Sequence, residues 1–244
     1  MKANYLPFFL IIFVTCQPQE KPINKNWLGQ SIDFSQIKEV INTYHMYDST
    51  DSKVGSMVYG FSFENSMLVA RDTSQFDDGS VYETAEFGLD TSDFELKTVS
   101  IDFSTQQAVL DIDLIQSEGK VKGNYVIMRD TLVTEFPFDS AYQHDVFRSE
   151  LYMLFHTLKM NEGDSISFAA LAPTSMAISL VSLSYDGSET ITTKAGTFDC
   201  DVLWLRTDGK MPNNKVWISK VYPRKVIKFY VPGPELDIEL VSQR

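Results

Sequence analysis

VSIDFSTQQAVLDIDL, residues 99–114, contains two runs in which apolar and polar residues alternate, separated by a short polar segment. The apolar residues stand at every second position of both runs, namely Val99, Ile101, Phe103, Leu110, Ile112 and Leu114. Because side chains of a β-strand alternate between its two faces, each run predicts a strand with one buried and one solvated face. Two such strands joined by a short turn predict an antiparallel hairpin.

The same alternation recurs along most of the chain on both sides of this hairpin. It covers residues 57–63 upstream and 121–127, 165–168, 178–185, 190–194, 198–206, 215–219, 225–231 and 236–241 downstream. Turn sequences such as Asp77-Asp78-Gly79, Ser104-Thr105 and Glu118-Gly119 separate the earlier strands. With no internal repeat and no second linker, these roughly ten or eleven strands predict a single β-rich domain over residues 31–244.

A different period appears in DVFRSELYMLFHTLKM, residues 145–160. Its apolar residues recur at the spacing of one helical face, which predicts a long amphipathic helix of about four turns. Residues 31–46 have a weaker helical spacing and are expected to hold a short helix. One helix cannot cover so many strands, so we expect one curved antiparallel sheet, an open or half barrel, with the long helix across it. Whether the concave side is packed or hollow stays open at this point.

The N-terminus has the pattern of an export signal. Lys2 precedes an apolar run at residues 6–14, which is too short to span a bilayer as a helix. The following Phe13-Val14-Thr15-Cys16 resembles a lipobox, the motif at which lipoprotein signal peptidase cuts before a diacylated cysteine. This predicts a signal peptide over residues 1–15, a lipid on Cys16, and a linker over residues 16–30. The alternative is an ordinary secretory signal that happens to end at a cysteine.

The expected location follows from these features. Lipid on Cys16 would tether the domain to a membrane of the cell envelope, since several acyl chains give stable anchoring. Gln17 stands where an aspartate would favour the inner membrane, so we expect the outer membrane, facing the periplasm. The net charge of −12 argues against nucleic acid as a partner, because phosphates would be repelled.

No catalytic site, metal site or cofactor site is predicted. The three histidines, His45, His144 and His156, are too far apart in sequence for a recognisable metal motif. Gly163-Asp164-Ser165 resembles the block of one hydrolase family, but no Asp-x-x-His follows it, so a turn is expected there. The carboxylate pairs Asp111/Asp113 and Asp199/Asp201 are interpreted as the solvated sides of strands, and Cys200 as a buried apolar residue.

Several features of residues 150–244 resemble an envelope family, the domain of unknown function 3108. They are Thr192-Thr193-Lys194-Ala195-Gly196-Thr197-Phe198-Asp199-Cys200, Val216-Trp217-Ile218-Ser219, Pro223-Arg224-Lys225-Val226-Ile227-Lys228 and the closing strand Leu236 to Leu240. The resemblance implies a curved antiparallel sheet similar to the open barrels of lipoprotein carriers and other periplasmic lipid-handling proteins. The family has no assigned chemistry, so no residue role follows from it.

Two functions of different classes remain after these exclusions. The first is a non-catalytic envelope lipoprotein whose curved sheet binds an apolar or amphiphilic ligand such as lipid. The alternative is a structural or protein-interaction module with a solidly packed barrel, and an unrecognised hydrolase is the third choice. The sequence names neither the ligand nor a protein partner.

Overall fold

The computed structural model describes residues 24–27, 30–33, 37–92, 95–118, 120–141, 146–209 and 211–244. The predicted signal peptide, Cys16 and His144 lie outside the described residues, as does Gly119 of the predicted Glu118-Gly119 turn. The short strands β1 (Asn24–Trp27) and β2 (Gln30–Asp33) pair as a separate two-stranded sheet, which spans the predicted boundary between the linker and the domain at residue 30.

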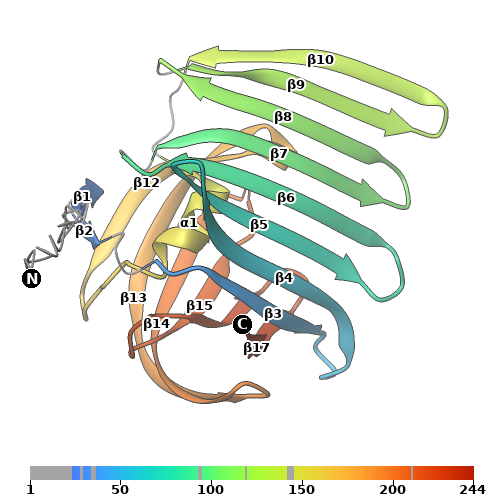
Figure 1. Ribbon diagram of the computed structural model, residues 1–244. Coiled ribbons are helices and arrows are strands. Elements are labelled where there is room, and N and C mark those ends of the chain that lie inside the picture. Colours follow the sequence, from blue (N-terminus) through green and yellow to red (C-terminus); the bar gives the residue numbers. More distant parts are fainter. Residues whose placement is uncertain are drawn as a thin grey trace, which may run out of the picture.

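The main structure is one sheet of 15 strands (Figure 1). Its order is β10-β9-β8-β7-β6-β5-β4-β3-β17-β16-β15-β14-β13-β12-β11, and all neighbours are antiparallel except β11 and β12. The strands are β3 (Val40–Tyr47), β4 (Lys53–Glu64), β5 (Met67–Phe76), β6 (Val81–Asp90), β7 (Leu96–Thr105), β8 (Val109–Ser117), β9 (Lys120–Arg129), β10 (Leu132–Ala141), β11 (Val146–Phe147), β12 (Ser165–Ala172), β13 (Ala177–Thr193), β14 (Gly196–Thr207), β15 (Asn214–Ser219), β16 (Val226–Val231) and β17 (Leu236–Gln243).

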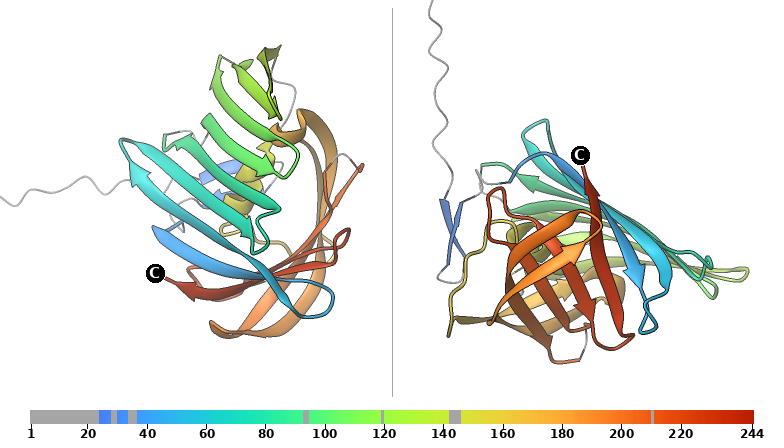
Figure 2. Two further views of the ribbon diagram at one scale, coloured as in Figure 1. Left: turned by 90° about the vertical axis from the view of Figure 1, so that its right-hand side faces the viewer. Right: turned by 90° about the horizontal axis from the view of Figure 1, so that it is seen from below.

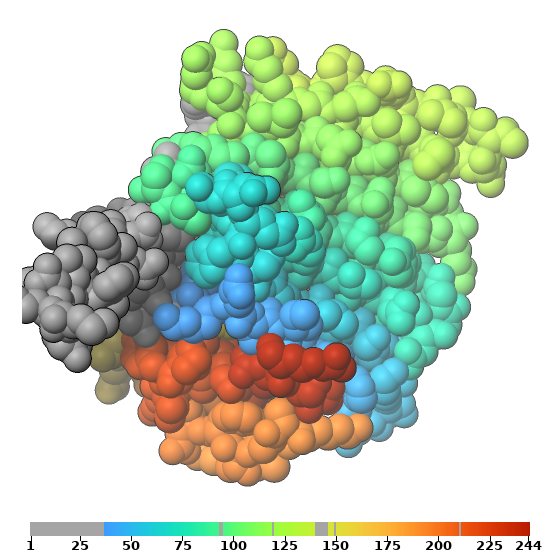
Figure 3. Space-filling view, in the orientation of Figure 1, coloured from blue at the N-terminus to red at the C-terminus, as the bar shows by residue number. Residues whose placement is uncertain are grey.

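The sheet is folded over on itself into two walls. Strands β3–β10 form one wall, strands β12–β17 form the other, and the walls join where β3 pairs with β17 (Figures 1 and 2). The strands of the first wall follow one another in sequence order across one face of the molecule (Figure 3). The edge strands β10 and β11 are not neighbours in the strand order, so the sheet is open. Only residues 142–145 separate them in sequence, which limits the gap at that corner to about 18 Å.

The one α-helix of the described residues, α1 (Arg148–Leu154), lies between the two walls (Figures 1 and 2). Its Tyr152 ring contacts Tyr59 of β4 on one wall and Phe229 of β16 on the other, with centroid separations of 6.1 and 5.2 Å. Together with the buried side chains of both walls, α1 forms a single apolar core. The prediction of one open, curved, mainly antiparallel sheet is therefore confirmed.

The prediction of a long amphipathic helix is wrong, because α1 has only seven residues. Val146 and Phe147 before it pair with β12 as strand β11. After Leu154 the chain tightens, since the amide N–H groups of His156 and Thr157 bond to carbonyl oxygens three residues back. Nearly every residue from 151 to 160 is buried, so the apolar pattern reflects enclosure between two walls and not one helical face.

The expected helix over residues 31–46 is also wrong. Residues 40–47 form strand β3, in which Asn42, Tyr44 and Met46 are buried, while Thr43 and His45 between them are half-buried. Pairing with β4 on one side and β17 on the other satisfies the backbone of this segment, and that pairing outweighs a helical spacing of a few residues.

The predicted strand count was too low, because β3, β5, β6, β10 and β11 were not recognised. In the opposite direction, the two strands predicted within residues 178–194 are a single strand, β13. In β5 and β6 the reason is specific: polar residues occupy positions on the face turned toward α1, so the expected alternation is broken. Asp72, Ser74 and Glu83 are those residues, and each lines a cavity.

Arg224 ties the segment after α1 to the second wall. Its side chain is buried, and it donates to the carbonyl oxygens of Leu158 and Ser219 and to the Asp201 carboxylate, the last at 2.6 Å. The Nδ1–H group of His156 donates to the Arg224 carbonyl oxygen at 2.8 Å. Three separate segments therefore meet on one guanidinium group.

We predict that Arg224→Met lowers the free energy of unfolding by about 3 kcal/mol, because it leaves the half-buried Asp201 carboxylate and two carbonyl groups without their donor. Urea unfolding followed by tryptophan fluorescence measures this. Lys220→Met is the matched control, since exposed Lys220 lies 3.8 Å from the same carboxylate and contributes little. Equal stability of the two variants would contradict the role given to Arg224.

Candidate functional site

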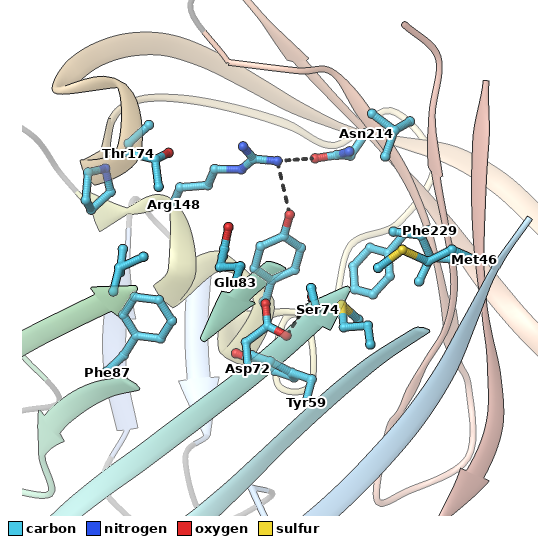
Figure 4. A pocket seen from close by; sticks show the side chains of 17 residues that line it. Met46, Tyr59, Asp72, Ser74, Glu83, Phe87, Arg148, Thr174, Asn214 and Phe229 are labelled. Atoms are coloured by element: carbon cyan, nitrogen blue, oxygen red, sulfur yellow. Dashed lines mark hydrogen bonds between the residues drawn. The ribbon is translucent and has the colours of Figure 1, made fainter. Parts of the chain in front are cut away.

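A cavity of about 230 Å³ lies between the two walls, beside α1 (Figure 4). Both walls, the helix and the 3₁₀ turn Pro173–Ser175 contribute to its lining. The lining residues are Met46, Met57, Tyr59, Asp72, Ser74, Glu83, Phe87, Ile101, Arg148, Tyr152, Ala172, Pro173, Thr174, Asn214, Phe229, Val231 and Ile238. The concave side of the sheet is therefore mostly filled by the apolar core, and part of it is a cavity.

Most of the cavity lining is apolar. Met57 of β4, Phe87 of β6 and Ile101 of β7 belong to the first wall, whereas Phe229 of β16 and Ile238 of β17 belong to the second. Methionine side chains adapt to ligands of irregular shape, and aromatic rings offer large contact areas. This combination suits the hydrocarbon part of a small molecule.

A polar group of side chains occupies one region of the cavity. The strand register places Asp72 of β5 opposite Tyr59 of β4, and Ser74 opposite Glu83 of β6. All four side chains therefore share one face of three adjacent strands. The Ser74 hydroxyl donates to the Asp72 carboxylate at 2.9 Å.

The environment of the two carboxyl groups disfavours their charged forms. Burial, with a smaller contribution from the negative charge of Glu83, raises the pKa of Asp72 to about 7. Burial also raises the pKa of Glu83, and the positive charge of Arg148 opposes that rise. Carboxyl groups with raised pKa values inside a cavity are a common feature of binding and catalytic sites.

Arg148 lies across the cavity from these carboxyl groups (Figure 4). It is the first residue of α1, and its Nη2 atom is 3.3 Å from the Tyr152 hydroxyl and 3.4 Å from Asn214 Oδ1. Residues four apart on a helix are neighbours, which explains the contact with Tyr152. The guanidinium is thus held toward the second wall.

Tyr59 is the least satisfied polar group of the site. Its side chain is 5% exposed, and its hydroxyl has no hydrogen-bond partner among the described residues. A buried hydroxyl without a partner is destabilising by roughly 1–3 kcal/mol, so a ligand that bonds to it gains affinity.

The residues singled out from the sequence lie elsewhere in the fold. Cys200 is fully buried, as predicted, and burial raises the pKa of its thiol to about 12. Gly163 and Asp164 form the expected turn, in which the Asp164 carboxylate accepts from the Asn161 amide N–H at 2.7 Å. Asp201 is not on a solvated face as expected, since it pairs with buried Arg224.

The two described histidines are separated from the cavity lining and from each other. His45 is on the opposite face of β3 from Met46 and lies beside Tyr47. His156 is buried against the Phe61 ring, and burial lowers its pKa to about 4. Within the described ranges, no group of three or more His, Cys, Asp or Glu residues is placed to hold a metal ion.

Asp72, Glu83, Arg148 and Tyr59 were not predicted as site residues. The available signal was polar residues at positions where neighbouring strands carry apolar ones, and it becomes readable only once the strand register is known. Arg148 had no signal of its own, because the segment over residues 145–160 was interpreted only through its apolar residues.

The family model for a protein of unknown function, DUF3108, matches residues 44–241. The chain belongs to the DUF3108 family. The match extends well upstream of residues 150–244, on which the resemblance was recognised, and includes the strands that carry Asp72 and Glu83. Among curated proteins there is no significant match.

Three solved structures are similar to this DUF3108 chain to different degrees. A β-barrel-like protein of domain of unknown function DUF1849 from Brucella abortus is 11% identical, with a TM-score of 0.54 over 85% of this chain and 97% of that chain. A proposed exported protein with a YmcC-like fold from Bacteroides fragilis is 12% identical, with a TM-score of 0.37 over 85% and 97%. A proposed lipoprotein from Parabacteroides distasonis is 11% identical, with a TM-score of 0.30 over 86% and 96%. At these identities the first likeness shows the fold alone.

Helices of the described part of this DUF3108 chain are all too short or too polar to cross a membrane.

We predict that Asp72→Asn stabilises the DUF3108 chain at pH 8 by about 2 kcal/mol. The folded chain holds the Asp72 proton up to a pKa of about 7, against an ordinary value of 3.8, so the wild type loses stability as pH rises through this window. This predicted gain in the free energy of unfolding is roughly half of what the full pKa shift of Asp72 corresponds to, because Asp72 keeps some solvent contact.

Urea unfolding at pH 8 and pH 4.5 measures this difference. The gain from Asp72→Asn should shrink at pH 4.5, where the folded wild type already carries a neutral Asp72. Asp113→Asn, on the exposed face of β8, is the control and should change the stability by no more than a few tenths of a kcal/mol at either pH. A loss of stability of equal size at both pH values would show that Asp72 is not a strained buried acid.

Proposed function

We propose that this chain is a non-catalytic lipoprotein of the cell envelope that binds the apolar part of a small amphiphile in the cavity beside α1. The observation that supports this most directly is the cavity itself, because it lies inside the folded sheet with apolar walls and a few polar groups at one side. That combination is the usual design of a small-molecule site, in which polar groups orient the ligand.

The anchoring part of the proposal rests on the N-terminal sequence. A lipid on Cys16 would tether the domain, and the residues between it and the sheet would allow the cavity to approach a membrane surface. Gln17 favours the outer membrane, with the domain facing the periplasm. A tethered domain with an apolar cavity is suited to holding a lipid or a lipid-like molecule.

The non-catalytic part of the proposal rests on the composition of the cavity. Cys200 and both described histidines are absent from its lining, and Ser74 contacts an acid instead of a histidine base. The paired carboxyl groups of Asp72 and Glu83 are the reason to keep a hydrolase as the third choice, since such pairs also serve in acid–base chemistry.

The alternative, a protein-interaction module, is supported by a different surface. On the face of β6–β10 turned away from α1, the strand register aligns Tyr82, Ser104, Val109, Met128 and Val133, of which Tyr82, Met128 and Val133 are exposed apolar residues. Exposed apolar residues in a row are a feature of binding surfaces, although this row is small and Ser104 interrupts it.

We predict that 1-octanol binds the wild-type chain and that Met57→Trp weakens its binding at least tenfold, because the larger side chain fills the cavity. Isothermal titration calorimetry measures both affinities. Val58→Trp is the matched control, since Val58 is the next residue of β4 and points to the exposed face. Octanol that binds Met57→Trp as well as wild type, or that binds neither protein, would contradict the cavity as a binding site.

We predict that Cys16→Ser abolishes incorporation of a clickable palmitate and releases the protein from the detergent phase, because the lipobox has no other sulfur to acylate. Cys200→Ser should leave both unchanged, since Cys200 is buried in the sheet. If the Cys16→Ser variant incorporates the label, or if the wild type does not, the lipobox interpretation is wrong and the N-terminus is an ordinary secretory signal.

A further inference from the structure

The polar region of the cavity presents three oxygen-bearing groups on adjacent strands. Asp72 and Tyr59 are a directly opposed pair, and Glu83 is diagonal to Asp72 across β5 and β6. Diagonal neighbours on one face of a sheet have Cβ atoms about 7 Å apart, which leaves room for one small group between their carboxyl groups. Figure 4 shows both carboxyl groups pointing into the same space.

In the described part of the chain, the only cation that acts on these acids is Arg148, whose charge is felt by Glu83 from a distance. Among the described residues, neither Asp72 nor Glu83 forms an ion pair within 4 Å, and Arg148 is the only basic residue that lines the cavity. Arg148 is directed instead at the Tyr152 hydroxyl and the Asn214 side-chain oxygen. The cavity therefore contains more acidic than basic groups, in surroundings of low dielectric constant where a missing counter-charge matters.

Tyr59 provides an independent indication that a ligand group belongs here. Tyr59 lines the cavity and is more than nine-tenths buried, and its hydroxyl has no hydrogen-bond partner among the described residues. A hydroxyl oxygen can accept a hydrogen bond, and the two carboxylates can accept others. The three groups together match the three N–H donors of a primary ammonium.

We propose that the ligand of this cavity is an amphiphile with a protonated primary amine, whose ammonium group binds between Asp72, Glu83 and the Tyr59 hydroxyl. Its hydrocarbon chain lies against Met57, Phe87 and Phe229. This inference rests on the proposed function and adds the chemical class of the ligand. Burial raises the pKa of both acids, and a cation bound between them would oppose that rise. An anionic head group would face two acids, and it would have to displace the partners of Arg148.

The test compares three probes of equal chain length at pH 8 by isothermal titration calorimetry: octylamine, 1-octanol and octanoate. The protein is expressed without residues 1–15 and carries Cys16→Ser, so that neither lipid nor detergent is present. Octylamine should bind at least tenfold more tightly than octanol, and octanoate should bind most weakly. Octanol or octanoate binding as tightly as octylamine overturns the amine proposal but leaves the cavity as an apolar site. No binding of any probe overturns the proposed function itself.

A double variant, Asp72→Asn with Glu83→Gln, assigns the preference to the acids. It should bind octanol as the wild type does and lose the tenfold preference for octylamine. Asp113→Asn with Glu86→Gln is the matched control on the outer faces of β8 and β6 and should keep that preference. A double variant that still prefers octylamine tenfold contradicts the proposal.

Vesicles distinguish a membrane lipid from a free amine. After incubation with mixed phosphatidylethanolamine and phosphatidylglycerol vesicles, the protein is examined by native mass spectrometry. If the protein retains phosphatidylethanolamine, the amine of the ligand belongs to a lipid head group. If the protein retains no lipid but binds octylamine, the ligand is a soluble amine. Retention of phosphatidylglycerol in preference to phosphatidylethanolamine overturns the proposal.

Discussion

The fold depends on covering the inner face of one very large sheet. A sheet of 15 strands exposes far more apolar surface on one side than the seven residues of α1 can cover, so the sheet must fold over and bury that face against itself. The helix fills the middle, where Tyr152 contacts both walls. A cavity remains between the helix and the two walls, and the site is thus a consequence of how the sheet folds over.

The general architecture could be predicted from the sequence because it depends on apolar residues that recur at every second position. The alternation over residues 99–114 marks β7 and β8, and the imbalance between many strands and one helix predicts an open, curved sheet. The length of α1 could not be predicted, because a segment enclosed by two walls is apolar on all sides and resembles a longer amphipathic helix. Arg224, whose contacts hold the chain after α1, is far away in sequence.

The candidate site was hidden by the same features that make it a site. Asp72, Ser74 and Glu83 occupy positions on β5 and β6 that face the interior, where the strand pattern calls for apolar residues. Their polarity removed the alternation that would have identified the strands, so strand and site were missed together. Natural proteins break local rules most often at functional positions, and this broken alternation is consistent with that tendency.

The claim that the folded sheet holds a ligand is tested most directly on protein isolated from the cells that produce it. Native mass spectrometry of the wild type and of Met57→Trp, each extracted under mild conditions, compares the intact mass with the mass after denaturation. The account predicts a non-covalent mass on the wild type that is released by denaturation and is absent from Met57→Trp. Identical native and denatured masses for the wild type, across repeated preparations, would contradict it.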